Sequence, residues 1–145
     1  MKRSFWLAVA AYLLPTFPLG YFWHLVTFAE QYHRLAMYRS EVIIPLGLVS
    51  MLIQAFFFAW AYPRLFETGR GRWLRSAGLA GVVFGVLAWS FTTLPVAAKY
   101  QMSSVLDFML LESAFTVLQF LVVSPLIALA HRQEAAMTAA AGQAA

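Results

Sequence analysis

The sequence contains no cysteine, and only 11% of its 145 residues are charged, where a soluble domain carries about 25%. Without cysteine there are no disulfides, thiolate nucleophiles or cysteine-ligated metals. Hydrophobic residues make up 62% of the chain and aromatic residues 17%, more than a soluble core of this size can bury. The composition therefore excludes a soluble globular domain and a disordered chain, and predicts a polytopic membrane protein.

Four apolar stretches are each long enough to cross a bilayer, which takes about 20 residues. They comprise residues 5–28, 42–62, 73–98 and 105–130. The short connections predict that consecutive helices are antiparallel neighbours. The predicted fold is all-α, an antiparallel four-transmembrane-helix bundle forming one domain over residues 1–134. The Ala-rich residues 135–145 lack apolar periodicity and are predicted to form a flexible cytoplasmic tail.

The first stretch follows a basic start, as a signal peptide does, but it is too long and no small-residue cleavage site follows it. Pro15, Pro18 and Gly20 interrupt it instead. Because each proline removes a backbone donor and crowds the preceding turn, we expect a retained, kinked helix.

The distribution of Lys and Arg predicts the orientation in the membrane. The side that holds the N-terminus carries seven basic residues and the other side three: Lys2, Arg3, Arg64, Arg70, Arg72, Arg75 and Arg132 against Arg34, Arg39 and Lys99. This excess places both termini in the cytoplasm. The net charge of +4 does not indicate nucleic-acid binding, because the basic residues border apolar runs, where they contact lipid headgroups.

Polar residues inside the spans recur at spacings that put them on one face of each helix. They include Ser50 and Gln54 in the second span, Glu112, Thr116 and Gln119 in the fourth, and His24 and Thr92 in the first and third. Because such groups are costly in hydrocarbon, they are expected to face the bundle interior. With a rise of about 1.5 Å per residue, they predict an outward-facing polar layer, a mid-membrane pair of glutamines and an apolar inner half.

Glu112 is the central residue of this predicted layer. A carboxyl at this depth needs a partner, and His24 is the best candidate by depth, with Thr92, Thr93 and Lys99 as alternatives. Two interpretations stay open. Glu112 accepts a proton or binds a cation in a cavity that opens outward, or it is a structural carboxyl that fastens the fourth helix to the first.

No cofactor and no metal is predicted. His24 and His131 lie at opposite ends of the bundle, so they cannot hold one haem. Four residues near the outer interface have metal-ligand character but match no known spacing: His24, Glu30, His33 and Glu41. The sequence has no phosphate-binding loop, dinucleotide fingerprint, HExxH motif or nucleophile elbow, so no catalytic residue is predicted.

Two glycines in the third span form a small-x-x-x-small stripe, Gly81 and Gly85, which lets another helix backbone approach closely. That helix belongs to the same bundle, to a second copy of the chain or to a partner membrane protein. Elsewhere, Asp107 is expected to complement the helix dipole after a cap at Ser103 or Ser104. The basic and aromatic residues 32–39 are expected to form a short interfacial helix.

Three segments, Ile44-Pro45-Leu46-Gly47-Leu48, Ala97-Ala98-Lys99-Tyr100 and Phe108-Met109-Leu110-Leu111-Glu112, resemble those of small four-helix bacterial inner-membrane proteins that carry no assigned activity. The resemblance covers most of the chain and implies the same fold and location. It implies no substrate, cofactor or catalytic residue.

Three classes of function fit these observations. The first is a small binding or accessory membrane protein, a scaffold or a lipid-associated subunit, which suits the size and the lack of catalytic motifs. The second is a small oligomeric transporter or channel that uses Glu112, although the apolar inner half offers no exit. The third is an enzyme that modifies a lipid or isoprenoid, with Glu112 and His24 as acid and base.

Overall fold

The computed structural model describes residues 3–39, 41–69 and 71–143, with side chains as far as Arg132. Every regular element in these ranges is helical: α1 (Arg3–Phe22), η1 (Trp23–Thr27), α2 (Ala29–Arg34), α3 (Ile44–Leu65), α4 (Trp73–Lys99) and α5 (Val105–Gln143). Four helical segments in the described chain are long and apolar enough to cross a membrane: Arg3–Thr27, Ile44–Leu65, Trp73–Lys99 and Val105–Arg132. The prediction of an all-α bundle of four such helices is confirmed.

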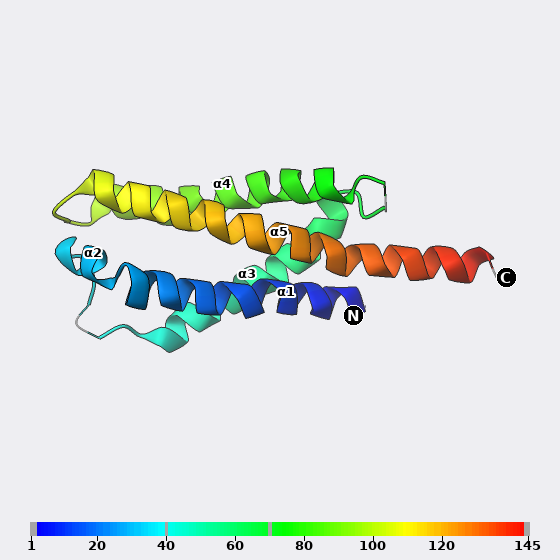
Figure 1. The fold of residues 1–145 in the computed structure, drawn as a ribbon, viewed down its shortest axis with the longest axis horizontal. Coiled ribbons are helices and arrows are strands. Elements are labelled where there is room, and N and C mark those ends of the chain that lie inside the picture. Colours follow the sequence, from blue (N-terminus) through cyan, green and yellow to red (C-terminus); the bar gives the residue numbers. More distant parts are fainter. Residues whose placement is uncertain (1–2, 40, 70, 144–145) are drawn as a thin grey trace.

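Helix α5 lies between α4 and α1 and packs along both, while α1 packs in turn against α3 (Figure 1). The helix α3 crosses the others obliquely, so the expectation that consecutive helices are neighbours does not hold for the α3 and α4 backbones. Aromatic side chains fill the space between them, and Phe58 of α3 stacks on Phe84 of α4 with ring centroids 4.5 Å apart. Phe120 of α5 also contacts Phe58.

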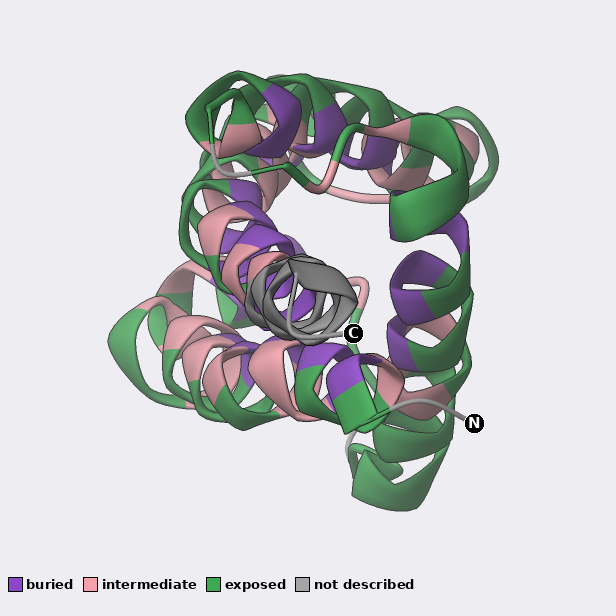
Figure 2. Cartoon of the chain, turned by 90° about the vertical axis from the view of Figure 1, so that its right-hand side faces the viewer, coloured by how far each residue is buried: buried purple, intermediate pink, exposed green. Residues whose placement is uncertain are grey.

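Figure 2, seen from the end where both termini lie, shows buried residues on the inward faces of the helices and exposed residues outside. The outward side chains are large and apolar. Leu14, Phe91 and Leu121 are 74%, 73% and 68% exposed. Soluble proteins do not present so continuous an apolar surface, whereas hydrocarbon solvates it without cost.

The first span becomes irregular after the residues at which the sequence predicted a kink. Helix α1 continues through Pro15 and Pro18, and the chain then winds as a π-helix from Trp23 to Thr27. The Phe28 N–H closes it by donating to the Trp23 carbonyl at 3.1 Å. Short π-helical segments insert an extra residue into a helix and often occur at functional sites. This one carries His24.

The chain between the first two spans packs onto α5. The short helix expected at residues 32–39 lies earlier, at Ala29–Arg34, and Ala36, whose φ is 57°, turns the chain away after it. Ser103 joins this segment to the other loop at the same end of the bundle. Its N–H donates to the Leu35 carbonyl at 3.2 Å and its hydroxyl to the Arg34 carbonyl at 2.8 Å.

Helix α5 begins with the expected cap, because the Asp107 N–H donates to the Ser104 hydroxyl at 3.2 Å. It continues past the predicted end of the span at residue 130 and reaches Gln143. The Ala-rich composition explains the extension, since alanine has the highest helix propensity. The flexibility predicted for residues 135–145 stays a prediction, and residues 144–145 lie outside the described chain.

Candidate functional site

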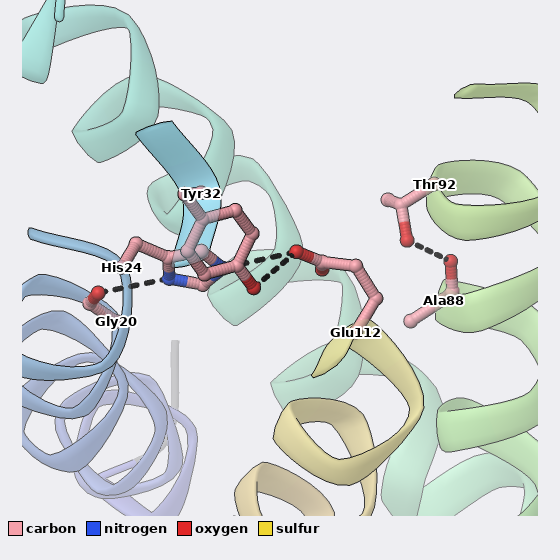
Figure 3. A network of polar contacts seen from close by, with 6 residues as sticks. All are labelled: Gly20, His24, Tyr32, Ala88, Thr92 and Glu112. Carbon is pink, nitrogen blue, oxygen red and sulfur yellow. Dashed lines mark hydrogen bonds and ion pairs between the residues drawn. The ribbon is translucent and has the colours of Figure 1, made fainter. Parts of the chain in front are cut away.

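A cluster of three polar side chains joins the π-helix, α2 and α5 (Figure 3). The His24 Nε2 atom lies 3.3 Å from Glu112 Oε1, and the Tyr32 hydroxyl donates to the same carboxyl oxygen at 2.7 Å. The side chains of His24 and Glu112 are 21% and 16% exposed. They are therefore mostly sheltered but remain reachable from one side.

The protonation of this cluster follows from its geometry. His24 Nδ1 lies 2.9 Å from the Gly20 carbonyl oxygen, which can only accept, so Nδ1 carries a hydrogen. For the 3.3 Å contact of Nε2 with Glu112 Oε1 to be a hydrogen bond, one further proton must lie between the two atoms. Either an imidazolium faces a carboxylate, or a carboxylic acid donates to a neutral imidazole. The pair is neutral overall in both arrangements.

Tyr32 completes the cluster as a neutral donor. Burial, followed by the nearby charge of Glu112, raises the pKa of Tyr32, so its phenol stays protonated in any physiological medium. Tyr38 stacks on Tyr32 with ring centroids 4.9 Å apart. Burial and Glu112 raise the pKa of Tyr38 as well.

The structure confirms His24 as the partner predicted for Glu112 and does not bring the alternatives to it. The Thr92 hydroxyl donates to the Ala88 carbonyl of its own helix at 2.8 Å, away from Glu112 (Figure 3). Thr93 is buried within α4, and Lys99 is exposed in its last turn. Thr116 lies on the side of α5 that faces α4, so neither Thr92 nor Thr116 joins the cluster.

A second polar network crosses the bundle near its middle and includes both predicted glutamines. The Gln119 amide donates to the Tyr12 hydroxyl at 3.0 Å, and that hydroxyl donates to Gln54 Oε1. The Gln54 amide in turn donates to the Ser50 hydroxyl at 3.1 Å. The glutamines are thus bridged by Tyr12, which ties α5, α1 and α3 together.

Sequence reasoning missed the two tyrosines at the centres of these networks. Tyr12 precedes Thr16, Gly20 and His24 at the same four-residue spacing, so extending that face by one turn could have found it. Tyr32 gave no such signal, because it lies outside the spans and reaches Glu112 only after the chain turns back over α5.

A groove of about 440 Å³ opens beside His24, between α1, α3 and the segment that joins them. Its polar residues, His24, Tyr38 and Arg39, gather at the α2 end of the bundle. Deeper in the membrane its walls are apolar, and they include Phe17 and Met51. Glu112 does not line the groove and lies behind His24.

The half of the bundle nearest the termini is filled by apolar side chains. Ala8, Phe58, Val123 and Ile127 are almost fully buried between the glutamine network and that end. Beyond them, His131 stacks on Tyr62 with ring centroids 5.4 Å apart. Mainly apolar side chains therefore lie between the glutamine network and His131, with the buried hydroxyl of Ser124 among them.

Gly81 and Gly85 face α5 of the same chain. A Cβ at Gly81 would lie 3.0 Å from the Ser124 hydroxyl oxygen, and one at Gly85 would lie 3.4 Å from the Phe120 ring. These glycines let α4 and α5 approach closely. A contact with a second copy or a partner protein through the same stripe stays a prediction.

Within the described residues, no group of three or more His, Asp or Glu side chains is placed to hold a metal ion. His24 and Glu112 are two residues of these types in contact with each other. The other side chain at Glu112 Oε1 is Tyr32, which donates a hydrogen bond to it. The chemistry available here is proton sharing and hydrogen bonding.

No family model, curated protein or solved structure matches the chain. The site geometry therefore carries the functional argument by itself.

Proposed function

We propose that this chain is a small binding membrane protein that holds a lipid-like ligand in the groove between α1 and α3. One observation carries the proposal. The groove of about 440 Å³ has polar residues at one end and apolar walls below, and its volume falls within the range of about 300–1,000 Å³ that is usual for ligand sites. This polarity matches that of an amphiphile in one leaflet of a bilayer.

The His24–Glu112–Tyr32 cluster supports the groove by fixing its polar end. Three hydrogen-bonding contacts hold His24 and Glu112 in place, so the imidazole edge presented to a ligand has one orientation. A rigid polar group beside an apolar wall favours binding, because little side-chain freedom is lost when the ligand arrives.

The test is to fill the groove. Gly47 lines it, and a Cβ there would meet no atom within 4 Å, so Gly47→Leu should fold normally and occupy the site. The matched control is Gly78→Leu, at an equally open helical glycine on α4. Native mass spectrometry of gently solubilised protein should show a retained lipid adduct in the wild type and in Gly78→Leu. Retention of the same adduct by Gly47→Leu would contradict the proposal.

The location and orientation are part of the proposal. We place the chain in the inner membrane of a bacterium with both termini in the cytoplasm, supported by the seven basic residues on one side against three on the other and by the resemblance of Ile44–Leu48 to inner-membrane proteins. A reporter fused after Ala145 should be active only in the cytoplasm. Activity on the opposite side would overturn this orientation and would place the polar end of the groove at the cytoplasmic face.

An accessory role with a partner fits the same size and fold. The partner is a membrane protein or a second copy that approaches the stripe of Gly81 and Gly85, which also lines an apolar groove along α4 and α5. Cross-linking in intact membranes should then capture a defined complex. A monomer in every sample would contradict it.

Catalysis is a second candidate, favoured by the 3.3 Å contact of His24 with Glu112 next to the groove. A lipid- or isoprenoid-modifying enzyme would use the shared proton as acid and base. Product formed from a lipid extract should then be lost in both His24→Gln and Glu112→Gln. Transport through Glu112 has less support, because Val123 and Ile127 belong to a buried, mainly apolar cluster between the glutamine network and the other end. Proton flux in liposomes that is lost in Glu112→Gln would revive it.

A further inference from the structure

Among the described residues, no acidic side chain lines the groove between α1 and α3. Among its described lining residues, those with polar groups are Tyr21, His24, Tyr38 and Arg39. The phenol of Tyr38 is held in its protonated, donating form because burial and the neighbouring Glu112 raise its pKa. Both ring nitrogens of His24 are engaged by Gly20 and Glu112, whereas Arg39 can only donate and the tyrosine phenols can donate. The groove therefore favours a ligand head that accepts hydrogen bonds.

Arg39 carries the positive charge of this site without a compensating acid. It has no ion pair with any carboxylate in the part of the chain that the structure describes. Its sequence neighbour Glu41 is exposed and does not line the groove. Glu112 does not line the groove, and its carboxyl oxygen lies 3.3 Å from His24 Nε2. The mouth of the groove is thus electrostatically suited to an anion.

The deeper part of the groove suits one hydrocarbon chain. From His24 to Phe17 along α1, and from Ile44 to Met51 along α3, the walls extend by seven residues, or about 10 Å at 1.5 Å per residue. Gly20 and Gly47 lie on facing walls and leave room where larger side chains would close the groove. A volume of about 440 Å³ is small for a ligand with two acyl chains.

We infer that the groove binds a single-chain lipid with an anionic head, whose carboxylate or phosphate contacts Arg39 and Tyr38 and whose chain lies toward Gly47 and Met51. This inference rests on the proposed function, since it names the class of ligand for the same groove. Arg39 supplies the selectivity for charge and the apolar walls supply the affinity for the chain.

The test is a titration by native mass spectrometry in an uncharged detergent with three probes of equal chain length. The probes are palmitate, palmitoyl-lysophosphatidylglycerol and hexadecanol. Wild type is compared with Arg39→Gln and with Arg34→Gln, a control that removes another exposed arginine at the same end but outside this groove. Gly47→Leu serves as the filled-groove variant.

Wild type and Arg34→Gln should bind at least one anionic probe about tenfold more tightly than hexadecanol, the usual size of one charge-assisted contact. In Arg39→Gln this preference should disappear while hexadecanol binding persists. Whichever anionic probe binds more tightly identifies the head as carboxylate or phosphate. Gly47→Leu should bind none of the probes.

Two outcomes would overturn the inference in distinguishable ways. If the wild type binds hexadecanol as tightly as both anions, and Gly47→Leu loses all three, the charge selectivity is wrong while the proposed lipid-binding function stands. If wild type and Gly47→Leu behave alike with every probe, the groove is not the binding site and both proposals fail. An equal loss of preference in Arg34→Gln would assign the effect to general surface charge and would also overturn the role of Arg39.

Discussion

His24 and Glu112 approach to 3.3 Å while the other imidazole nitrogen lies 2.9 Å from the Gly20 carbonyl. This arrangement leaves one proton for the two side chains to share and makes the pair neutral in a setting where a single charge would be costly. The contact is also a fastening between the first and last spans, because the two residues are far apart in the chain. The structural and the functional interpretation of Glu112 therefore depend on the same contact, and substitutions can separate them.

Replacement of Glu112 by leucine should destabilise the protein by about 2 kcal/mol. The change leaves the Tyr32 hydroxyl and the His24 ring without their acceptor in a sheltered site. Glu112→Gln should cost less than half as much, because the amide oxygen still accepts from Tyr32. Thermal unfolding in detergent measures both effects. Asp107→Asn, at an exposed acid on the same helix, should have little effect. Equal losses in the leucine and glutamine variants would show that charge, rather than hydrogen bonding, holds the cluster.

Tyr12→Phe should destabilise the bundle by about 1–2 kcal/mol, the upper range for hydrogen bonds between membrane helices. Its hydroxyl accepts from Gln119 and donates to Gln54, so its removal takes this partner from the Gln119 N–H and from the Gln54 Oε1 atom at once. Unfolding of Tyr12→Phe, Gln119→Leu and the double variant forms a thermodynamic cycle. The two losses should not add, because both break the same network. Additive losses would mean that Tyr12 and Gln119 act independently. Tyr21→Phe, at an exposed tyrosine of α1, is the control.

Gly81→Leu should separate α4 from α5 and cost about 1–3 kcal/mol. A Cβ at this position already comes within 3.0 Å of the Ser124 hydroxyl, and the larger side chain cannot be accommodated without a shift of the helix. Gly78→Leu, where a Cβ meets nothing within 4 Å, should change the unfolding temperature little. Ser124→Gly introduced together with Gly81→Leu should recover part of the loss. If both leucine variants are equally stable, the close approach of α4 to α5 does not depend on Gly81.

Ala36→Gly should stabilise the segment after α2 by about 1 kcal/mol. Ala36 has a φ of 57°, where a Cβ crowds the following carbonyl and glycine does not. Ala36→Val should have the opposite effect, because a β-branched side chain fits this conformation worst. Thermal unfolding of the three proteins gives the order directly. A valine variant as stable as the glycine variant would show that the turn adopts another conformation in the membrane.

The sequence by itself determined the fold class and the four spans, and it ranked His24 first among the candidate partners of Glu112. Hydropathy and helical spacing are local properties, and both span length and depth follow from the rise per residue. The rise per residue along the second and fourth spans also predicted that Gln54 and Gln119 lie at the same depth. It could not show that Tyr12 bridges them, since the rotation of α1 about its axis depends on how the whole bundle packs.

Only the tertiary structure decided the remaining features. Helix α3 crosses the others obliquely, and Phe58 stacks on Phe84 between α3 and α4, a contact between side chains that no local pattern encodes. That crossing separates α3 from α4 and bounds the groove that ends at His24 and Arg39. Tyr32 reaches Glu112 because α2 follows the π-helix at the end of the first span and its C-terminal end is held by Ser103 from the opposite loop. Local sequence thus sets which groups enter the membrane and how deep they lie, whereas helix crossing and loop return determine which of them meet.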